Sequence, residues 1–165
     1  MTAVPTTKQL EGAVYFWNAD QPNGEFSQWY PSSFVVAGQS YPTAEHYMMA
    51  AKARLFRDHD SERLIIDATE PEQVRDLGRK IKNFDGKLWN EKKFALVLDG
   101  NRAKFKDPIL RAVMLGTGDR IFVEASPVDR IWGVGFDRDE APKRVSEWGE
   151  NLMGKVMMQV LTPCI

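Results

Sequence analysis

The stretch from Tyr41 to Lys52, Tyr-Pro-Thr-Ala-Glu-His-Tyr-Met-Met-Ala-Ala-Lys, decides how this chain folds. Thr43 follows a proline and is suited to cap a helix, because its hydroxyl can accept a hydrogen bond from a free backbone N–H. The residues after it are good helix formers, and neither Gly nor Pro occurs before Asp58. The pattern predicts a helix over about residues 43–56.

Glu45 and Lys52 share one face of this predicted helix. At 100° per residue, Lys52 returns to within about 20° of Glu45, and the two Cα atoms lie about 10 Å apart along the axis. Two long side chains at that separation can frame one small ligand. The alternative stays open that Glu45 only favours the helix dipole while Lys52 extends to solvent.

Composition limits the classes of protein that this chain can be. Its 165 residues are 43% hydrophobic and 27% charged, which fits one globular domain with a sizeable core. The formal net charge is −1, so no global positive field attracts nucleic acid. Any contact with nucleic acid would have to be local.

Cysteine and histidine usage argues against a disulfide framework and a zinc site. Cys164 is the single cysteine, and the two histidines, His46 and His59, form no metal-binding spacing. We therefore expect neither metal nor cofactor. The N-terminus lacks the apolar core of a signal peptide, and no apolar run approaches ~18 residues. The sequence predicts a soluble intracellular protein, cytoplasmic or nuclear, with no membrane partner.

Hydrophobic periodicity predicts an α+β fold, a single mostly helical domain with a small sheet. Residues 1–10 are polar and are expected to form a flexible arm, with the domain over 11–165. Gly100 is expected to weaken the longest helix. Strands are expected at 14–17, 34–36 and 121–125, and about six helices in all, including two within 60–82 and others over 88–105, 108–116 and near the C-terminus.

Two further segments can contact a ligand. The basic run Arg75, Arg79, Lys80 and Lys82 is either a solvated face or a phosphate-binding surface. The segment from Asp129 to Gly135 combines a carboxylate, a flat indole at Trp132 and two glycines that allow close backbone approach.

These motifs together resemble the NADAR family, also called the YbiA-like family. The resemblance covers nearly the whole chain and departs from the family at Gln28, where Asn is usual. Its motifs are Phe16, Gly24-x-Phe26-Ser27, Pro42-Thr43-x-Glu45-His46-Tyr47 through Lys52, Gly78-Arg79, Trp89, Lys104-Phe105, Leu115-x-Thr117, Val123-Glu124, Asp129-x-x-Trp132-Gly133-x-Gly135 and Asn151-x-x-Gly154.

The resemblance implies an N-glycosidase fold and activity. Two substrate classes are associated with such proteins: guanine bases of DNA or RNA that carry an N-linked ADP-ribose, and ribosylamino-pyrimidine phosphate intermediates of riboflavin synthesis. Both place ribose C1 on an exocyclic amine. We favour ADP-ribosylated guanine, because the basic residues near Arg75 can meet a nucleic-acid backbone. A non-catalytic module that binds ADP-ribose or a nucleotide is the third possibility. No obligate protein partner is evident.

Such a sugar can open to an iminium, which a lysine in an apolar pocket can capture as a Schiff base. Lys52 is the candidate nucleophile and Glu45 the candidate acid and base. If the ring stays closed, Glu45 would activate water and Lys52 would only bind substrate. The resemblance also implies substrate-binding roles for Phe16, Gly24, Ser27, Tyr47, Trp89, Glu124, Asp129, Trp132, Gly133, Gly135 and Asn151.

Overall fold

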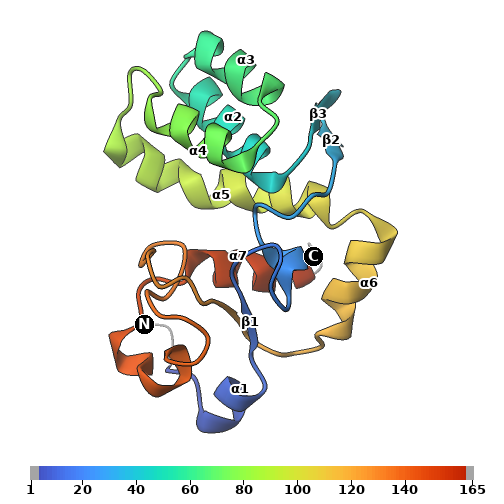
Figure 1. Cartoon of the computed structure of the whole chain (residues 1–165), viewed down its shortest axis with the longest axis vertical. Helices are drawn as coiled ribbons and strands as arrows, with labels where there is room; N and C mark the ends of the chain where they lie inside the picture. The colour runs from blue at the N-terminus through green and yellow to red at the C-terminus, as the bar shows by residue number, and fades with distance from the viewer. Residues whose placement is uncertain (1–3, 163–165) are drawn as a thin grey trace. The chain divides into compact units, whose positions relative to one another are not determined.

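The computed structural model describes residues 4–162, which divide into two compact units (Figure 1). Among the described residues, unit 1 comprises 4–27 and 108–162, and unit 2 comprises 28–107. The first three residues of the predicted arm, and Cys164, lie outside the described residues. Between residues 4 and 162, no helix combines the length and the apolar character needed to cross a membrane.

Unit 2 begins with a β-hairpin that leads the chain into its central helix. Strands β2 (Phe34–Val36) and β3 (Gln39–Tyr41) pair antiparallel, with Phe34 opposite Tyr41. The two turn residues, Ala37 and Gly38, have φ angles of 49° and 82°. Positive φ at both positions is typical of the type I′ turn, one of the two turn types whose twist matches that of the flanking strands.

Four helices make up the rest of unit 2, and α2 lies at their centre. Thr43 caps α2 by accepting a hydrogen bond from the His46 N–H, as the sequence predicted. Helix α2 contacts each of the other three and is buried over most of its length. The helices are α2 (Ala44–Leu55), α3 (His59–Asp67), α4 (Pro71–Arg79) and α5 (Gly86–Lys104).

Two glycines allow the neighbouring helices to approach α2 closely. A Cβ atom on Gly78 of α4 would lie 2.1 Å from the Met49 sulfur, and one on Gly100 of α5 would lie 2.3 Å from the Tyr47 ring. Both separations are far inside van der Waals contact. Gly100 was expected only to weaken α5. The structure shows that close packing of α5 against Tyr47 also requires a glycine there, which periodicity alone does not indicate.

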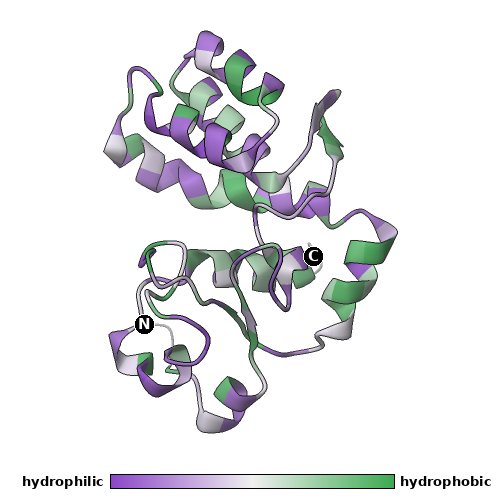
Figure 2. Cartoon of the chain, in the orientation of Figure 1, coloured by the Kyte–Doolittle hydropathy of each residue, from purple (hydrophilic) through white to green (hydrophobic). Residues whose placement is uncertain are grey.

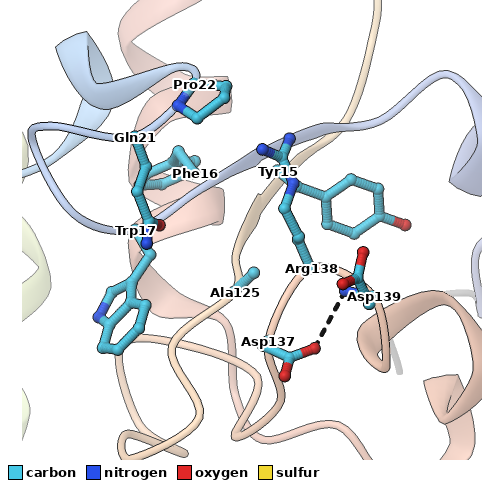
Figure 3. Close-up of a pocket in the computed structure, with 9 residues that line it drawn as sticks. All are labelled: Tyr15, Phe16, Trp17, Gln21, Pro22, Ala125, Asp137, Arg138 and Asp139. Carbon is cyan, nitrogen blue, oxygen red and sulfur yellow. Dashed lines mark hydrogen bonds between the residues drawn. The ribbon is translucent and has the colours of Figure 1, made fainter.

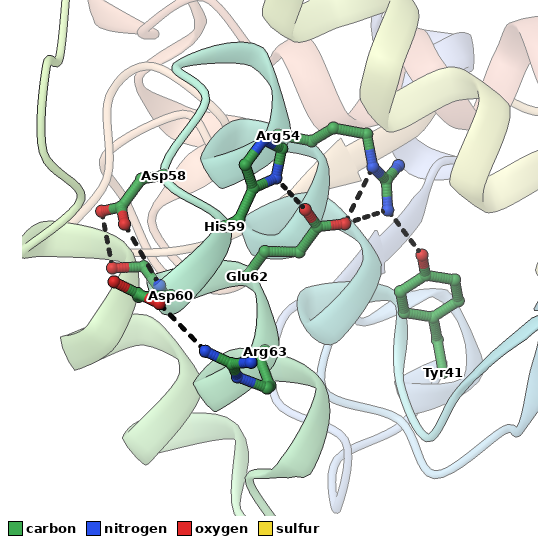
Figure 4. A network of polar contacts seen from close by, with 8 residues as sticks. Tyr41, Arg54, Asp58, His59, Asp60, Glu62 and Arg63 are labelled. Carbon is green, nitrogen blue, oxygen red and sulfur yellow. Dashed lines mark hydrogen bonds and ion pairs between the residues drawn. The ribbon is translucent and has the colours of Figure 1, made fainter.

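Polar contacts join α2 to α3 and to the hairpin (Figure 4). Arg54 donates to Glu62 at 2.6 Å and to the Tyr41 hydroxyl at 3.1 Å. Asp58 caps α3 by accepting from the Ser61 backbone, and it also accepts from the Lys82 N–H at 2.8 Å. Asp58 thus connects the start of α3 to the segment that follows α4.

Unit 1 is built around two short parallel strands. Strand β1 (Val14–Phe16) pairs with β4 (Phe122–Glu124) in the register Val14 to Phe122, and helix α7 (Leu152–Leu161) packs against β4. Figure 2 shows that α7 is largely hydrophobic. The rings of Phe16, Phe26 and Phe122 meet edge to face at 4.9–6.4 Å.

The α+β class is confirmed, with two differences in detail. The strands form two separate two-stranded sheets instead of one. Residues 4–162 contain seven α-helices, because Thr7–Glu11, which begins in the predicted arm, forms α1 with a capping box between Thr6 and Gln9. The remaining elements of unit 1 are η1 (Gly24–Phe26), α6 (Pro108–Gly116), η2 (Ala141–Lys143) and η3 (Val145–Glu147).

Gly100→Ala is expected to lower the free energy of unfolding by about 1–3 kcal/mol, because the new methyl group overpacks the buried Tyr47 ring. Gly116→Ala is the matched control: it lies in helix α6 with nothing within 4 Å of the added carbon. Denaturant unfolding of both variants checks this. Equal stability of the two variants would contradict the close contact between α5 and α2.

Candidate functional site

Glu45 is a buried acid in the first turn of α2. The residue is 8% exposed, and its backbone N–H donates to the Gln28 carbonyl at 3.0 Å. Burial raises the pKa of Glu45 from 4.5 to about 7, against the opposing positive charges of Arg75 and Lys52. A carboxyl with that pKa can both give and accept a proton near neutral pH.

The buried amide side chains of Gln28 and Asn101 bond to each other. Gln28 Nε2 donates to Asn101 Oδ1 at 2.9 Å, and Asn101 Nδ2 donates back to Gln28 Oε1 at 3.2 Å and to the Val97 carbonyl at 2.9 Å. This pair fixes the carbonyl that receives the Glu45 N–H. Gln28, which stands where the family usually has Asn, thus pairs with Asn101. The sequence alone did not single out Asn101.

Lys52 lies further along α2 and is partly buried. Its Nζ donates to the Gly78 carbonyl at 2.9 Å and lies 4.7 Å from the centre of the Phe84 ring and 5.5 Å from that of Trp89. Burial lowers the pKa of Lys52, while the negative charge of Glu45 opposes that change. The desolvated amine is thereby shifted towards the neutral, nucleophilic form.

Arg75 of α4 is the second positive charge that acts on Glu45. Its guanidinium lies 5.5 Å from the centre of the Trp29 ring, and its contact with Asp76 is long, at 3.4 Å. The side chain is 41% exposed, so it is accessible from solvent. Unit 2 thus places Trp89 and Phe84 near the Lys52 amine and brings the charges of Lys52 and Arg75 close enough to act on Glu45, and the roles of these residues stay predictions.

Comparisons with known proteins assign the chain to a family. The sequence profile described as the NADAR domain matches residues 15–162, a range that runs through both units. The chain belongs to the NADAR family.

Individual members of the family are similar over most of the chain. N-glycosidase R617 of Acanthamoeba polyphaga mimivirus is 41% identical over 82% of this chain and 84% of its own length. The NMR structure of YbiA from E. coli is 27% identical, with a TM-score of 0.73 over 90% of this chain and 82% of that one. A riboflavin biosynthesis protein of Vibrio vulnificus, VVA0006, is 28% identical over 92% of this chain but 38% of its own length.

Several NADAR motif residues of unit 1 hold the end of β4. The Asn151 side chain accepts from the Glu124 N–H and donates to the Phe122 carbonyl, each at 3.0 Å. The Gly133 carbonyl accepts from the Asn151 N–H at 3.2 Å, and a Cβ on Gly133 would lie 2.8 Å from the Glu124 carbonyl oxygen. Glu124, Gly133 and Asn151 are therefore brought together by contacts of the Asn151 side chain and of the backbone.

The segment from Asp129 to Gly135 is a turn with its own internal contacts. The Asp129 carboxylate accepts from the N–H groups of Ile131 and Trp132 at 2.7 and 2.9 Å. Gly135 has a φ of 83°, which a side chain would strain. Asp129 and Gly135 thus shape the turn that presents Trp132, and contact with substrate remains a prediction for all three.

The other predicted binding residues are mostly buried. Phe16 belongs to the ring cluster of unit 1, Tyr47 packs on Tyr41, and Ser27 ends η1. Gly24 is required by packing, because its added Cβ would lie 2.1 Å from the Ala19 carbonyl oxygen. These contacts explain the motif positions structurally, and their roles in binding stay predictions.

Glu45→Gln is expected to change how stability depends on pH. Between pH 4.5 and about 7 the folded protein keeps the Glu45 proton that the unfolded chain loses, so the free energy of unfolding falls as pH rises. The loss amounts to about 3 kcal/mol and is complete above pH 7. The variant is therefore expected to be more stable than the wild type at pH 8 by up to this amount.

Glu91→Gln, which removes an exposed carboxylate from α5, is the matched control. Urea unfolding of the three proteins from pH 4 to pH 8 provides the measurement. If the free energy of unfolding of Glu45→Gln changed with pH in parallel with that of the wild type, this carboxyl would not titrate as a buried group.

Proposed function

We propose that this chain removes ADP-ribose from guanine bases of nucleic acid, with Lys52 as the Schiff-base nucleophile and Glu45 as the acid and base. In its general form the activity is that of an enzyme, a hydrolase acting on N-glycosyl compounds, as the name of its 41% identical relative N-glycosidase R617 indicates. The finer proposal names the substrate and the residues that act on it.

The observation that supports the proposal is the mutual influence of two groups on α2, the buried Glu45 and the partly buried Lys52. Glu45 has a pKa near 7 because it is buried, and the pKa of Lys52 is lowered for the same reason. Each charge also acts on the other residue's pKa. Imine formation needs a group that donates a proton and an amine that attacks, and a carboxyl with a raised pKa together with an amine with a lowered pKa suits those two roles.

The first half of the reaction opens the sugar. The lone pair of the exocyclic nitrogen expels the ring oxygen from C1, and the Glu45 carboxyl protonates that oxygen. The neutral Lys52 amine then forms a bond to C1 of the resulting iminium. Glu45, now a carboxylate, takes a proton from the attacking amine and returns it to the guanine nitrogen.

The second half releases both products. The bond between C1 and the guanine nitrogen breaks, which restores the free amino group and leaves C1 joined to Lys52 as a Schiff base. Water adds to C1 while Glu45 accepts its proton. Collapse of the adduct breaks the bond to Lys52 and releases an open-chain ribose, so the net reaction consumes one water molecule.

The segment from Arg75 to Lys87 favours a nucleic-acid substrate. Arg79, Lys80, Lys82 and Lys87 are exposed on it. Gly78, whose carbonyl accepts the Lys52 hydrogen bond, lies in the same segment. Basic side chains beside the candidate nucleophile can contact phosphates locally although the whole chain has a net charge of −1.

A ribosylamino-pyrimidine phosphate is the second candidate substrate. It is favoured by the similarity to VVA0006, whose name assigns it to riboflavin biosynthesis. Its C1 is also attached to an exocyclic amine, so the same two residues can act on it. The accessible Arg75 guanidinium can bind its single phosphate.

The deciding experiment uses borohydride to reduce the Schiff base. The protein is incubated with an ADP-ribosylated guanine oligonucleotide or with the pyrimidine phosphate, and each mixture is examined by mass spectrometry with and without borohydride. We expect free guanine in the untreated oligonucleotide sample and a stable sugar adduct on Lys52 in the treated one. Glu45→Gln is expected to lower kcat by about 10²–10⁴-fold.

Two lysine variants control the assay. Lys52→Arg keeps the positive charge but cannot form the adduct, so it is expected to abolish both adduct and turnover, whereas Lys87→Arg changes an exposed lysine and is expected to retain both. Turnover without an adduct would contradict covalent catalysis by Lys52 and would favour direct attack by a water molecule that Glu45 activates. Cleavage of the pyrimidine alone would overturn the guanine assignment, and binding without turnover of either compound would overturn catalysis.

A further inference from the structure

Aromatic and charged side chains lie near one another in both units. Unit 1 contains a cavity of about 360 Å³, which Trp17 and Arg138 help to line (Figure 3). In unit 2, the Lys52 Nζ lies 4.7 Å from the centre of the Phe84 ring and 5.5 Å from that of Trp89. The arrangement in unit 2 bears on the proposed function, because Lys52 is its candidate nucleophile.

The two rings near Lys52 stand at the positions of a hydrophobic staple at the start of α5. Asp85 caps that helix by accepting from the Leu88 N–H at 3.2 Å. Phe84 directly precedes the cap, and Trp89 is the fourth residue after it. Hydrophobic residues at these two positions commonly fix the angle at which the chain enters a helix. The start of α5 therefore supplies both rings that lie near the Lys52 amine.

The short loop that carries Phe84 is also anchored before the ring. The Asp58 carboxylate accepts from the Lys82 N–H at 2.8 Å, and Asn83 turns the chain with a φ of 56°. The rings of Phe84 and Phe56 meet edge to face, with their centres 5.2 Å apart. These contacts hold the Phe84 ring in place, although the residue is 51% exposed.

A ring in this place acts on an amine in two ways. Its face carries partial negative charge and attracts an ammonium group within about 6 Å. Its bulk keeps water from the amine, and loss of water disfavours the charged form. Burial lowers the pKa of Lys52, so the second effect is already visible in this residue. The two effects oppose each other, and only the first requires an aromatic side chain.

We propose that Phe84 is a positioning residue for Lys52, whose ring attracts the charged amine and whose bulk keeps water from it. The ring holds the amine beside the Gly78 carbonyl, which accepts from Nζ at 2.9 Å. Because an amine must lose a proton before it attacks, the attraction to the ring limits how much of the reactive form is present. The effect of Phe84 on turnover rests on the proposed function, whereas its effect on the amine does not.

The test follows the Lys52 Cε carbon by NMR as pH is varied, and Lys52→Arg identifies the signal by removing it. Phe84→Leu removes the ring but keeps a bulky apolar side chain. Its midpoint is expected at lower pH than in the wild type, with about two- to fivefold more neutral amine at any pH well below the midpoint. Phe84→Ala also removes the cover, so its midpoint is expected above that of Phe84→Leu. Phe84→Tyr keeps the ring and is expected to keep the wild-type midpoint.

Leu64→Ala is the matched control. It removes an apolar side chain of α3 that is 55% exposed, close to the 51% of Phe84, and is expected to leave the midpoint unchanged. A midpoint in Phe84→Leu that equals or exceeds that of the wild type would overturn the inference, as would equal midpoints for Phe84→Leu and Phe84→Ala.

The pH dependence of kcat/KM separates this inference from the proposed function. If Lys52 is the nucleophile, Phe84→Leu is expected to shift the profile to lower pH by as much as it shifts the NMR midpoint. A lowered midpoint with an unshifted profile would support the effect of Phe84 on the amine and contradict the role of Lys52 as nucleophile. An unchanged midpoint in an enzyme that still forms the Lys52 adduct would overturn the role of Phe84 alone.

Discussion

Burial of the Glu45 carboxyl at the start of α2 is the constraint on which the candidate site depends. A helix N-terminus favours the charged form of an acid, as do the nearby charges of Arg75 and Lys52. Removal of water from around the buried carboxyl favours its protonated form, and this effect on the pKa is larger than the opposing effects of the two charges. The resulting pKa near 7 makes the residue a proton carrier at neutral pH, and it costs the folded state about 3 kcal/mol once the acid ionises.

The packing that creates this burial also shapes the surroundings of Lys52. Gly78 lets α4 approach Met49 of α2, and the carbonyl of the same glycine accepts the Lys52 hydrogen bond. Gly100 lets α5 approach Tyr47 in a similar way. The two glycines therefore set how closely two helices can approach the one that carries both candidate catalytic side chains.

Most elements of the fold follow from local sequence, whereas half of the site does not. Helical periodicity and the Thr43 cap locate α2 and place Glu45 and Lys52 on one face. Nothing in the local pattern indicates that Phe84, from a loop, lies over the Lys52 amine, or that Asn101 holds Gln28. Such contacts join residues far apart in the chain, so periodicity carries no information about them, and the split into two small sheets was missed for the same reason.

The most direct test of the central claim is to follow the Glu45 carboxyl carbon by NMR as pH is varied, in the wild type and in Lys52→Met. The account predicts a midpoint near 7 in the wild type. It predicts a higher midpoint in the variant, because the positive charge that opposes the effect of burial is gone. A wild-type midpoint near the ordinary 4.5, or a midpoint that does not respond to the loss of Lys52, would contradict the pairing of these two groups.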